Sequence, residues 1–362
     1  MSARTQLLAE HQDEADTLAP AGPAAPVDAL LVASVARRFY LENRSKVEIA
    51  KEFGVSRFKV ARLLEAAVAH DIVRIEITVP AEIDSALGKA LTERYGLRHG
   101  MVVDLPPGGD PVGDDTQPAA DRLSRWLGTA AAQLVAGILE EGDVLGLDGS
   151  PATAALSEAV TQLPACDVVQ LTGAHGQDLA RDTAAAAVRR TAAVGGGRAF
   201  PLYVPFLLPD PATATLLRSH PDTAETLDRS GRVTKAVVGI GAWHAGLSPV
   251  HDALTVSERE TLRARGACAD VAGQVYDTAG RAVPTELAAR TISATAGQLR
   301  GATEVIGVAG GARGVEALRA VLRARLLTGV VTDAATARLL LRPEVVDLPW
   351  AVPTPRAIER GQ

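Results

Sequence analysis

The sequence predicts an α/β protein in two parts, a small helical module near the N-terminus and a larger domain built on a parallel sheet. Three observations support this prediction. A length of 362 residues exceeds that of one typical domain. Residues 28–79 follow the pattern of three helices and a strand, whereas later residues alternate short apolar runs with Ala-rich helical stretches. Continuous apolar strands that alternate with helices are typical of a parallel sheet covered on both faces.

Composition narrows the class of protein. Apolar residues make up 47% and charged residues 22% of the chain, which is ordinary for a globular protein. No apolar run is long enough to cross a bilayer, and the first residues lack the apolar core of a signal peptide. Cys166 and Cys268 lie far apart and have no metal-ligand spacing. We therefore expect a cytoplasmic protein with no disulfide framework, no metal, no cofactor and no membrane partner.

The chain is expected to divide into four segments. Residues 1–27 would form a disordered tail, residues 28–80 the helical module, residues 81–97 a connector helix and residues 98–362 the large domain. The formal net charge is −6, but the stretch 28–79 holds nine Arg and Lys against seven Asp and Glu. A basic module attached to an acidic domain would present its positive face to nucleic acid.

Residues 28–80 carry the pattern of a winged helix-turn-helix. Ser45 and Glu48 form a capping box that begins the second helix. Gly54, four residues after the small Ala50, can take the positive φ of a sharp turn without penalty. Ser56 is a suitable N-cap for the third helix. The expected helices span residues 29–41, 45–53 and 56–69, and the alternating run 72–79, which Pro80 ends, is the expected wing.

The start of the third helix is predicted to contact DNA, because the N-terminal part of a recognition helix reaches base edges. Arg57 and Lys59 would read guanine or bind phosphate, whereas Arg62, one turn further on, would contact the backbone. The alternative is a simple three-helix bundle with a basic face exposed to solvent. It is less favoured, because such a bundle would not need the cap, the small residue, the glycine and the apolar positions at the spacing of a helix-turn-helix. The candidate DNA-binding residues are Ser45, Lys46, Ser56, Arg57, Phe58, Lys59 and Arg62.

The large domain begins with a helix and a polar loop. An apolar stripe from Ile83 to Tyr95 predicts an amphipathic helix over residues 82–95, which we interpret as a connector and oligomer contact. A Gly/Pro/Asp-rich loop is expected over residues 106–118. The expected strands span residues 144–147, 168–171, 199–204, 236–240, 305–308 and 329–332, and the helices among them include residues 122–139, 152–162 and 315–325.

Four of the expected strands end in glycine-rich turns, which lie near Gly149, Gly173, Gly239 and Gly310. Ligands of parallel sheets bind at the carboxyl ends of the strands. Backbone N–H groups in such turns and at helix N-termini can hold an anion. The loop after Gly310 is the best candidate, because Arg313 could clamp a phosphate with two hydrogen bonds. Close strand–helix packing explains any single turn, but four turns at one sheet edge predict an anionic or polyhydroxyl ligand.

Motifs in both parts resemble those of the SorC family of sugar-responsive transcription regulators. The N-terminal matches are residues 38–41, 48–56, 60–64 and 72–75, and the C-terminal matches are residues 169–173, 239–241, 266–270, 308–311 and 331–337. The resemblance implies a Rossmann-like effector domain related to glucosamine-6-phosphate deaminase and ribose-phosphate isomerase. It also implies that the Gly149 turn and the loop 310–313 hold a sugar phosphate and that Asp270 binds hydroxyls.

Two departures from the family pattern bear on the ligand. The run 148–151 (Asp-Gly-Ser-Pro) stands where the family commonly has Trp-Gly-x-Thr, so a hydroxyl would come from Ser150 or Thr153. Asp148 would repel a phosphate unless it pairs with hydroxyls, which keeps a neutral sugar or polyol open. Arg313 replaces the usual Lys, so the cation is kept but imine chemistry is excluded there. The candidate effector-binding residues are Asp148, Gly149, Ser150, Thr153, Gly173, His175, Asp270, Gly310, Gly311 and Arg313.

The function expected from these features is DNA-binding regulation controlled by a sugar or sugar phosphate. The partners would be double-stranded operator DNA and further copies of the chain, in a dimer or tetramer. One alternative is a sugar-phosphate isomerase or deaminase fused to a DNA module, with Asp270, Asp333 and His175 as acid–base candidates. Asp333 is more simply a helix N-cap, and His175 a solvent-facing residue or a ligand contact. The other alternative is a C-terminal domain that only oligomerises.

Overall fold

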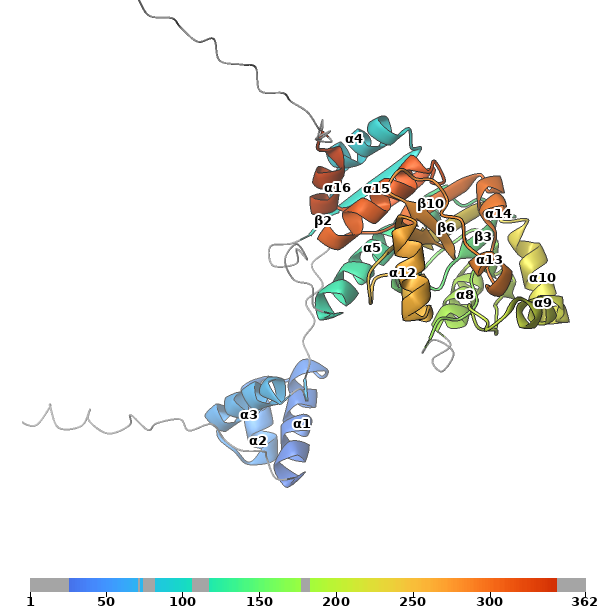
Figure 1. Ribbon diagram of the computed structural model, residues 1–362. Coiled ribbons are helices and arrows are strands. Elements are labelled where there is room, and N and C mark those ends of the chain that lie inside the picture. The colour runs from blue at the N-terminus through green and yellow to red at the C-terminus, as the bar shows by residue number, and fades with distance from the viewer. Residues whose placement is uncertain (1–25, 71, 74–81, 106–116, 177–182, 344–362) are drawn as a thin grey trace, which may run out of the picture. The chain divides into compact units, whose positions relative to one another are not determined.

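The computed structural model describes residues 26–70, 72–73, 82–105, 117–176 and 183–343. The chain divides into two compact units, Met1–Val79 and Pro80–Gln362, which are treated separately below (Figure 1). No helix in the described part of the chain combines the length and the apolar character that a membrane span requires. The expected N-terminal tail lies outside the described residues up to position 25, and the first helix already begins at Pro26.

The N-terminal unit consists of three helices, α1 (Pro26–Tyr40), α2 (Lys46–Phe53) and α3 (Arg57–Ala69). All three expected helices are therefore present. Val35, Ile49 and Val60, one from each helix, are fully buried at the centre of the unit. Burying an aliphatic side chain stabilises a fold by about 1.5–3 kcal/mol. The expected wing lies outside the described residues except for Ile72 and Val73.

The second unit is built on an eight-stranded sheet with the order β1-β2-β11-β10-β6-β3-β4-β5. All neighbouring strands are parallel apart from β1 and β2, which are antiparallel. The predicted α/β architecture with a mostly parallel sheet is thus confirmed. The strands are β1 (Glu82–Ile83), β2 (His99–Asp104), β3 (Val144–Leu147), β4 (Asp167–Gln170), β5 (Ala199–Phe200), β6 (Lys235–Gly239), β10 (Glu304–Val308) and β11 (Gly329–Asp333).

Two expectations at the ends of elements were wrong. Glu82 and Ile83 form strand β1 rather than the start of a helix, because Asp84 accepts a hydrogen bond from Leu87 N at 2.9 Å and caps helix α4 (Ser85–Tyr95). The strand expected over residues 199–204 stops at Phe200, and Leu202 N donates instead to Gln170 Oε1 at 3.0 Å.

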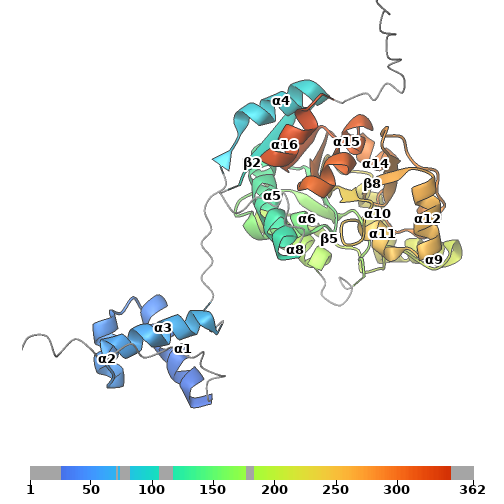
Figure 2. The same ribbon diagram turned by 60° about the vertical axis from the view of Figure 1, so that its left-hand side comes forward.

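Helices cover both faces of the sheet. Helices α5 (Gln117–Ile138), α6 (Pro151–Ala159) and α8 (Thr183–Gly195) form one layer, and α4, α15 (Val315–Arg323) and α16 (Ala334–Leu341) lie on the opposite face (Figure 2). Small residues allow α5 and α6 to approach closely. A Cβ placed on Gly128 of α5 would meet Ala155 Cβ at 2.5 Å and Ala152 O at 2.6 Å.

The second unit also contains a small second sheet, which was not predicted from the sequence and whose first strand follows β6 in the chain. It contains the antiparallel strands β7 (Gly241–Ala242), β8 (Ala267–Val271) and β9 (Gln274–Asp277). Because β6 ends at Gly239 and β7 begins at Gly241, one segment passes from the parallel sheet into the small sheet. The remaining elements are α9 (Pro211–Ser219), α10 (Pro221–Ser230), α11 (Pro249–Ala253), α12 (Val256–Ala264), α13 (Leu287–Arg290), α14 (Ala296–Gly301) and the short 3₁₀ helix η1 (Ala312–Gly314).

Candidate functional site

Capping interactions fix the geometry of α2 and α3 in the N-terminal unit. Ser45 Oγ accepts from Glu48 N at 3.3 Å, and Glu48 Oε2 accepts from Ser45 N at 2.9 Å, which completes the expected capping box. Gly54 ends α2 with φ +65°, as the turn requires. Ser56 Oγ then accepts from Lys59 N at 3.1 Å and begins α3.

The predicted DNA-binding residues lie exposed at the starts of α2 and α3. The first turn of α3 contains no acidic residue. Phe58 is 68% exposed, and the Arg57 guanidinium lies 4.9 Å from the centre of its ring. Exposed side chains are also found at Ser45, Lys46, Ser56, Arg57, Lys59 and Arg62. Val60 and Leu64 of α3 are buried in the core, so Arg57, Phe58, Lys59 and Arg62 lie on the face of α3 that does not pack on α1 and α2.

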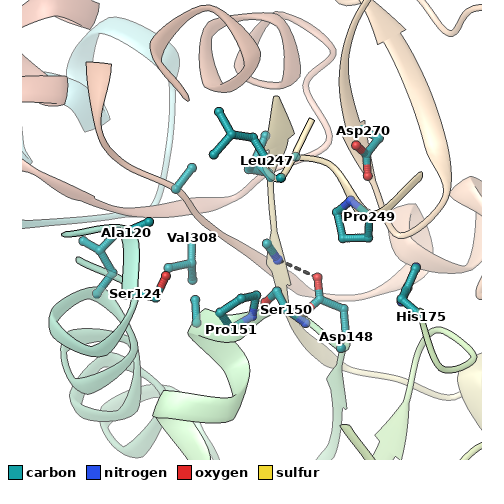
Figure 3. A pocket seen from close by; sticks show the side chains of 18 of the residues that line it. Ala120, Ser124, Asp148, Ser150, Pro151, His175, Leu247, Pro249, Asp270 and Val308 are labelled. Atoms are coloured by element: carbon teal, nitrogen blue, oxygen red, sulfur yellow. Dashed lines mark hydrogen bonds between the residues drawn. The ribbon is translucent and has the colours of Figure 1, made fainter. Parts of the chain in front are cut away.

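A cavity of about 280 Å³ in the second unit lies at the carboxyl ends of β3, β6 and β10 (Figure 3). The N-terminal half of α5 contributes Ala120 and Ser124 to one wall, and the small sheet contributes Asp270 to another (Figure 3). The glycine-rich turns after β3, β6 and β10 all reach this cavity. The sheet therefore brings together turns that are far apart in the sequence, as parallel strands predict.

Asp148 connects two of these turns and is only 6% exposed. Its Oδ2 accepts from Gly239 N at 2.6 Å, and its Oδ1 accepts from Ser150 N at 3.0 Å and from Thr153 Oγ1 at 3.1 Å. Burial raises the pKa of this carboxyl, and the hydrogen bonds from Ser150, Gly239 and Thr153 oppose that rise. Asp148 therefore both lines the cavity and holds the end of β3 against the end of β6.

Asp270, on β8, faces the cavity and is 4% exposed. Ser248 Oγ donates a hydrogen bond to its Oδ1, whereas its Oδ2 has no hydrogen-bond partner among the described residues. Burial raises the pKa of Asp270 to about 7, and the nearby carboxylates of Asp148 and Asp252 contribute to the rise. A carboxyl that is half protonated near neutral pH can both accept and donate hydrogen bonds.

Thr172 and His175 follow β4, and both residues line the same cavity. Thr172 Oγ1 and His175 Nδ1 are buried and have no hydrogen-bond partner among the described residues. The His175 ring stacks on Phe206 with 4.2 Å between ring centres and is half-buried, so of the two expectations for this residue a ligand contact fits better than a solvent-facing side chain. Burial lowers the pKa of His175 to about 4, and its imidazole is consequently neutral at neutral pH. Buried polar atoms without partners are rare in folded proteins and mark positions where a ligand can bond.

The structure places six of the ten candidate effector-binding residues around the cavity, namely Asp148, Gly149, Ser150, His175, Asp270 and Gly310. Thr153 lies beneath the turn, where its single hydroxyl proton can be donated either to Asp148 O, at 2.8 Å, or to Asp148 Oδ1. Gly173 is needed for packing, because a Cβ there would meet the carbonyl oxygens of Val204 and Pro205 at 2.8 Å.

The loop 310–314 was expected to be the main anion site, but its donors are arranged differently from such a site. Gly311 N donates to Asp333 Oδ2 at 2.8 Å, so a carboxylate of the chain already occupies that donor. Asp333 also accepts from Thr336 N at 2.8 Å and caps α16, which confirms it as an N-cap. Arg313 is exposed on η1 and is not among the residues that line the cavity, so the predicted phosphate clamp is not assembled there.

Several lining residues were missed by sequence reasoning. Thr172 directly precedes the Gly173 turn and was within reach of the motif argument. Ser124 of α5 and Asp252 of α11 carry no local signal, because their helices contact the cavity only through tertiary packing.

Trp243 follows β7, is buried, and packs edge-on against His251 with 5.5 Å between ring centres. The described residues contain no cluster of three His, Cys, Asp or Glu side chains that could hold a metal ion.

Comparison with known proteins identifies the family of the second unit. Residues 79–342 match the family described as "Putative sugar-binding domain", and the chain belongs to that family. The transcriptional regulator YjhU of Escherichia coli (strain K12) is 30% identical over 317 residues, which cover 85% of this chain and 93% of that protein.

Two further comparisons support the SorC relationship. The erythritol catabolism regulatory protein EryD of Brucella abortus (strain 2308) is 26% identical over 324 residues, 88% of this chain and 98% of that protein. The crystal structure of the full-length sorbitol operon regulator SorC from Klebsiella pneumoniae superimposes with a TM-score of 0.63 at 24% identity, covering 87% of this chain and all of that chain. Its fold is thus similar along both units of this protein.

Proposed function

We propose that this protein is a DNA-binding transcription regulator whose affinity for its operator is controlled by a sugar-type ligand bound in the Asp148–Asp270 cavity. The observation that carries the proposal is a pair of unsatisfied buried atoms, Thr172 Oγ1 and His175 Nδ1, in a cavity of a sugar-binding family domain. Named regulators, YjhU and EryD among them, are similar along more than four fifths of the chain.

The N-terminal unit supports the DNA-binding half of the proposal. A helix, a left-handed glycine turn and a second helix with an exposed, acid-free first turn fit a winged helix-turn-helix, with α3 as the recognition helix. Residues 72–79 would supply the wing. Arg57, Phe58 and Lys59 would enter the major groove, and Lys46 and Arg62 would contact phosphates.

In the second unit, a relationship to the fold of glucosamine-6-phosphate deaminase fits a cavity at the carboxyl edge of a parallel sheet. We assign the unit to sensing rather than turnover, because one acid–base candidate, Asp333, serves as a helix cap and the named relatives are regulators. The protein would act in the cytoplasm as a symmetric dimer or tetramer, so that paired recognition helices bind a pseudo-palindromic site. The ligand changes operator affinity only by binding two arrangements of the oligomer with different affinity.

The proposal is tested by selecting genomic DNA fragments on the purified full-length protein and then measuring binding to a selected fragment by fluorescence anisotropy. Sugars, sugar alcohols and their phosphate esters are added to the preformed complex. We expect at least one compound to change the dissociation constant of the complex about fivefold or more, the lower range of allosteric coupling. A protein that selects no fragment, or whose complex responds to no compound, would contradict the proposal.

A further inference from the structure

Several backbone donors at the glycine-rich turns of the cavity are already bonded to the chain itself. At the β3 turn, Ser150 N donates to Asp148 Oδ1 at 3.0 Å and Thr153 N donates to Ser150 Oγ at 3.3 Å. Position 151, the first residue of α6, is a proline and has no N–H. The N-terminus of α6 thus offers fewer free donors than an anion site at a helix start requires.

In the turns after β6 and β10, a backbone N–H group is likewise bonded to a carboxylate of the chain. Gly239 N donates to Asp148 Oδ2 at 2.6 Å, and Gly311 N donates to Asp333 Oδ2 at 2.8 Å. Two carboxylates of the protein therefore occupy positions on backbone donors that a bound phosphate would compete for. Displacing either carboxylate from its glycine N–H would remove a hydrogen bond from a buried carboxyl group, which is costly.

The charge around the cavity also disfavours an anion. Asp121, Asp148, Asp252 and Asp270 line it, and no Arg or Lys does so among the described residues. Among the described lining residues, the one basic side chain is His175, which is neutral because burial lowers its pKa to about 4. A phosphate ester carries close to two negative charges at neutral pH and would face these acidic groups, of which Asp270 is about half protonated near pH 7, with no Arg or Lys among the described lining residues.

The groups that are free suit hydroxyls. Asp270 Oδ2 can accept from a ligand O–H, and Thr172 Oγ1 and neutral His175 Nδ1 can each complete a hydrogen bond with one. A Cβ on Gly149 would lie 3.7 Å from Thr172 Oγ1 and 3.8 Å from His175 Nδ1, which places both atoms beside the Gly149 turn. A cavity of about 280 Å³ is at the small end of ligand sites and matches a compound of four to six carbons.

From these contacts we infer that the cavity binds an unphosphorylated sugar or sugar alcohol and discriminates against phosphate esters, with the carboxyl group of Asp148 filling the phosphate position. Asp270, Thr172 and His175 bind the ligand hydroxyls. This inference rests on the proposed function and narrows it to one chemical class.

The test is isothermal titration calorimetry of the full-length protein with matched pairs: erythritol and erythritol 4-phosphate, sorbitol and sorbitol 6-phosphate, ribose and ribose 5-phosphate. We expect the best neutral compound to bind at least tenfold more tightly than its phosphate ester. Thr172→Val and Asp270→Asn should each weaken that binding about tenfold or more, the usual loss when a hydrogen bond to a buried partner is removed.

Matched controls separate ligand contacts from general effects on the fold. Thr191 on α8 is also fully buried, has an unsatisfied hydroxyl and does not line the cavity, so Thr191→Val should leave ligand binding within twofold of the unaltered protein. Arg313→Ala should do the same. Tighter binding of a phosphate ester, or its loss in Arg313→Ala, would overturn the inference and leave the proposed function intact. Binding of no neutral compound would also overturn it, whereas failure to bind DNA would contradict the proposed function instead.

Discussion

The carboxylate of Asp148 lies against the backbone of Gly239, with 2.6 Å between Oδ2 and the glycine nitrogen. This hydrogen bond joins the ends of two neighbouring parallel strands, β3 and β6, at the point where the chain leaves the large sheet. A Cβ on Gly239 would lie 2.6 Å from Ser150 Cβ, so glycine is what permits the contact. The floor of the cavity is therefore set by a side chain and a backbone that are 91 residues apart.

Replacing Asp148 with Asn should destabilise the second unit. An amide has one acceptor oxygen, so it cannot accept from both Gly239 N and Ser150 N in the present geometry, and one buried donor would face an NH₂ group. We expect a loss of about 1–3 kcal/mol in the free energy of unfolding, measured by urea denaturation. Asp228→Asn, at an exposed position of α10, is the matched control and should change stability by less than about 0.5 kcal/mol. Equal stability of the two variants would show that the Asp148 contacts do not stabilise the fold.

Arg57→Ala and Lys59→Ala should each weaken operator binding about tenfold and leave ligand affinity unchanged. Both side chains are exposed at the start of α3, where a lost base or phosphate contact costs about 1–3 kcal/mol. The measurement is anisotropy with the selected DNA fragment over a range of salt concentrations. A phosphate contact is recognised by a decrease of about one in the salt slope. Lys89→Ala, an exposed lysine on α4 of the other unit, should have no effect, and unchanged affinity in both α3 variants would remove that helix start from the DNA interface.

Gly54→Ala and Gly137→Ala should shift stability in opposite directions. Neither added Cβ meets an atom within contact distance, so the backbone conformation alone decides. Gly54 has φ +65°, which an alanine adopts with strain, and the N-terminal unit should lose about 1 kcal/mol. Gly137 is an exposed position inside α5, where alanine should add about 0.5–1 kcal/mol to the second unit. Scanning calorimetry that showed both variants shifting in the same direction would contradict this explanation.

Asp270 and His175 should give the second unit opposite pH dependences. The pKa of Asp270 is raised to about 7, so the stability that it contributes is present below its ordinary pKa of 3.8 and is lost as the pH rises through about 7. The pKa of His175 is lowered to about 4, so its contribution is present above 6.5 and is lost as the pH falls through about 4. Between about pH 4 and 6.5 the two effects oppose each other.

Single variants should separate these two contributions. The free energy of unfolding of Asp270→Asn, relative to the unaltered protein, should increase between pH 4 and 7 by at most about 1.4 kcal/mol per pH unit. That of His175→Gln should decrease between pH 4 and 6.5. Denaturant titrations at intervals of half a pH unit provide the measurement. Differences that do not vary with pH would mean that neither group titrates as its burial requires.

Local sequence signals accounted for the elements that are stabilised locally. The capping box at Ser45, the glycine turn at Gly54 and the N-cap at Asp333 were all predictable, because each is decided by residues three or four apart. The parallel strands β3, β4, β6, β10 and β11 were recognisable as apolar runs, since both faces of the sheet are buried, whereas β2 was not predicted. Strand β8, which carries Asp270, was missed because Cys268 and Asp270 interrupt any apolar or alternating pattern.

The composition of the cavity was less predictable than its position. Its place at the carboxyl ends of the strands follows from topology, and six of the ten candidate residues line it. Which backbone donors remain free does not follow, because Asp148 and Asp333 each bond to a glycine nitrogen on a different strand connection. Arg313 was predicted to bind phosphate from a local glycine-rich motif. The structure shows that its side chain does not line the cavity.

The position of Trp243 gives the protein a built-in optical reporter. The indole is buried against His251, and the residues immediately after it, Gly246 and Leu247, belong to the cavity wall. Trp126 lies on α5 between Leu123 and Leu127, which also line the cavity. The chain has three tryptophans, and we expect filling of the cavity to change the emission of two of them, Trp126 and Trp243. Ligand exchange can therefore be followed in real time on the unlabelled protein, with and without DNA.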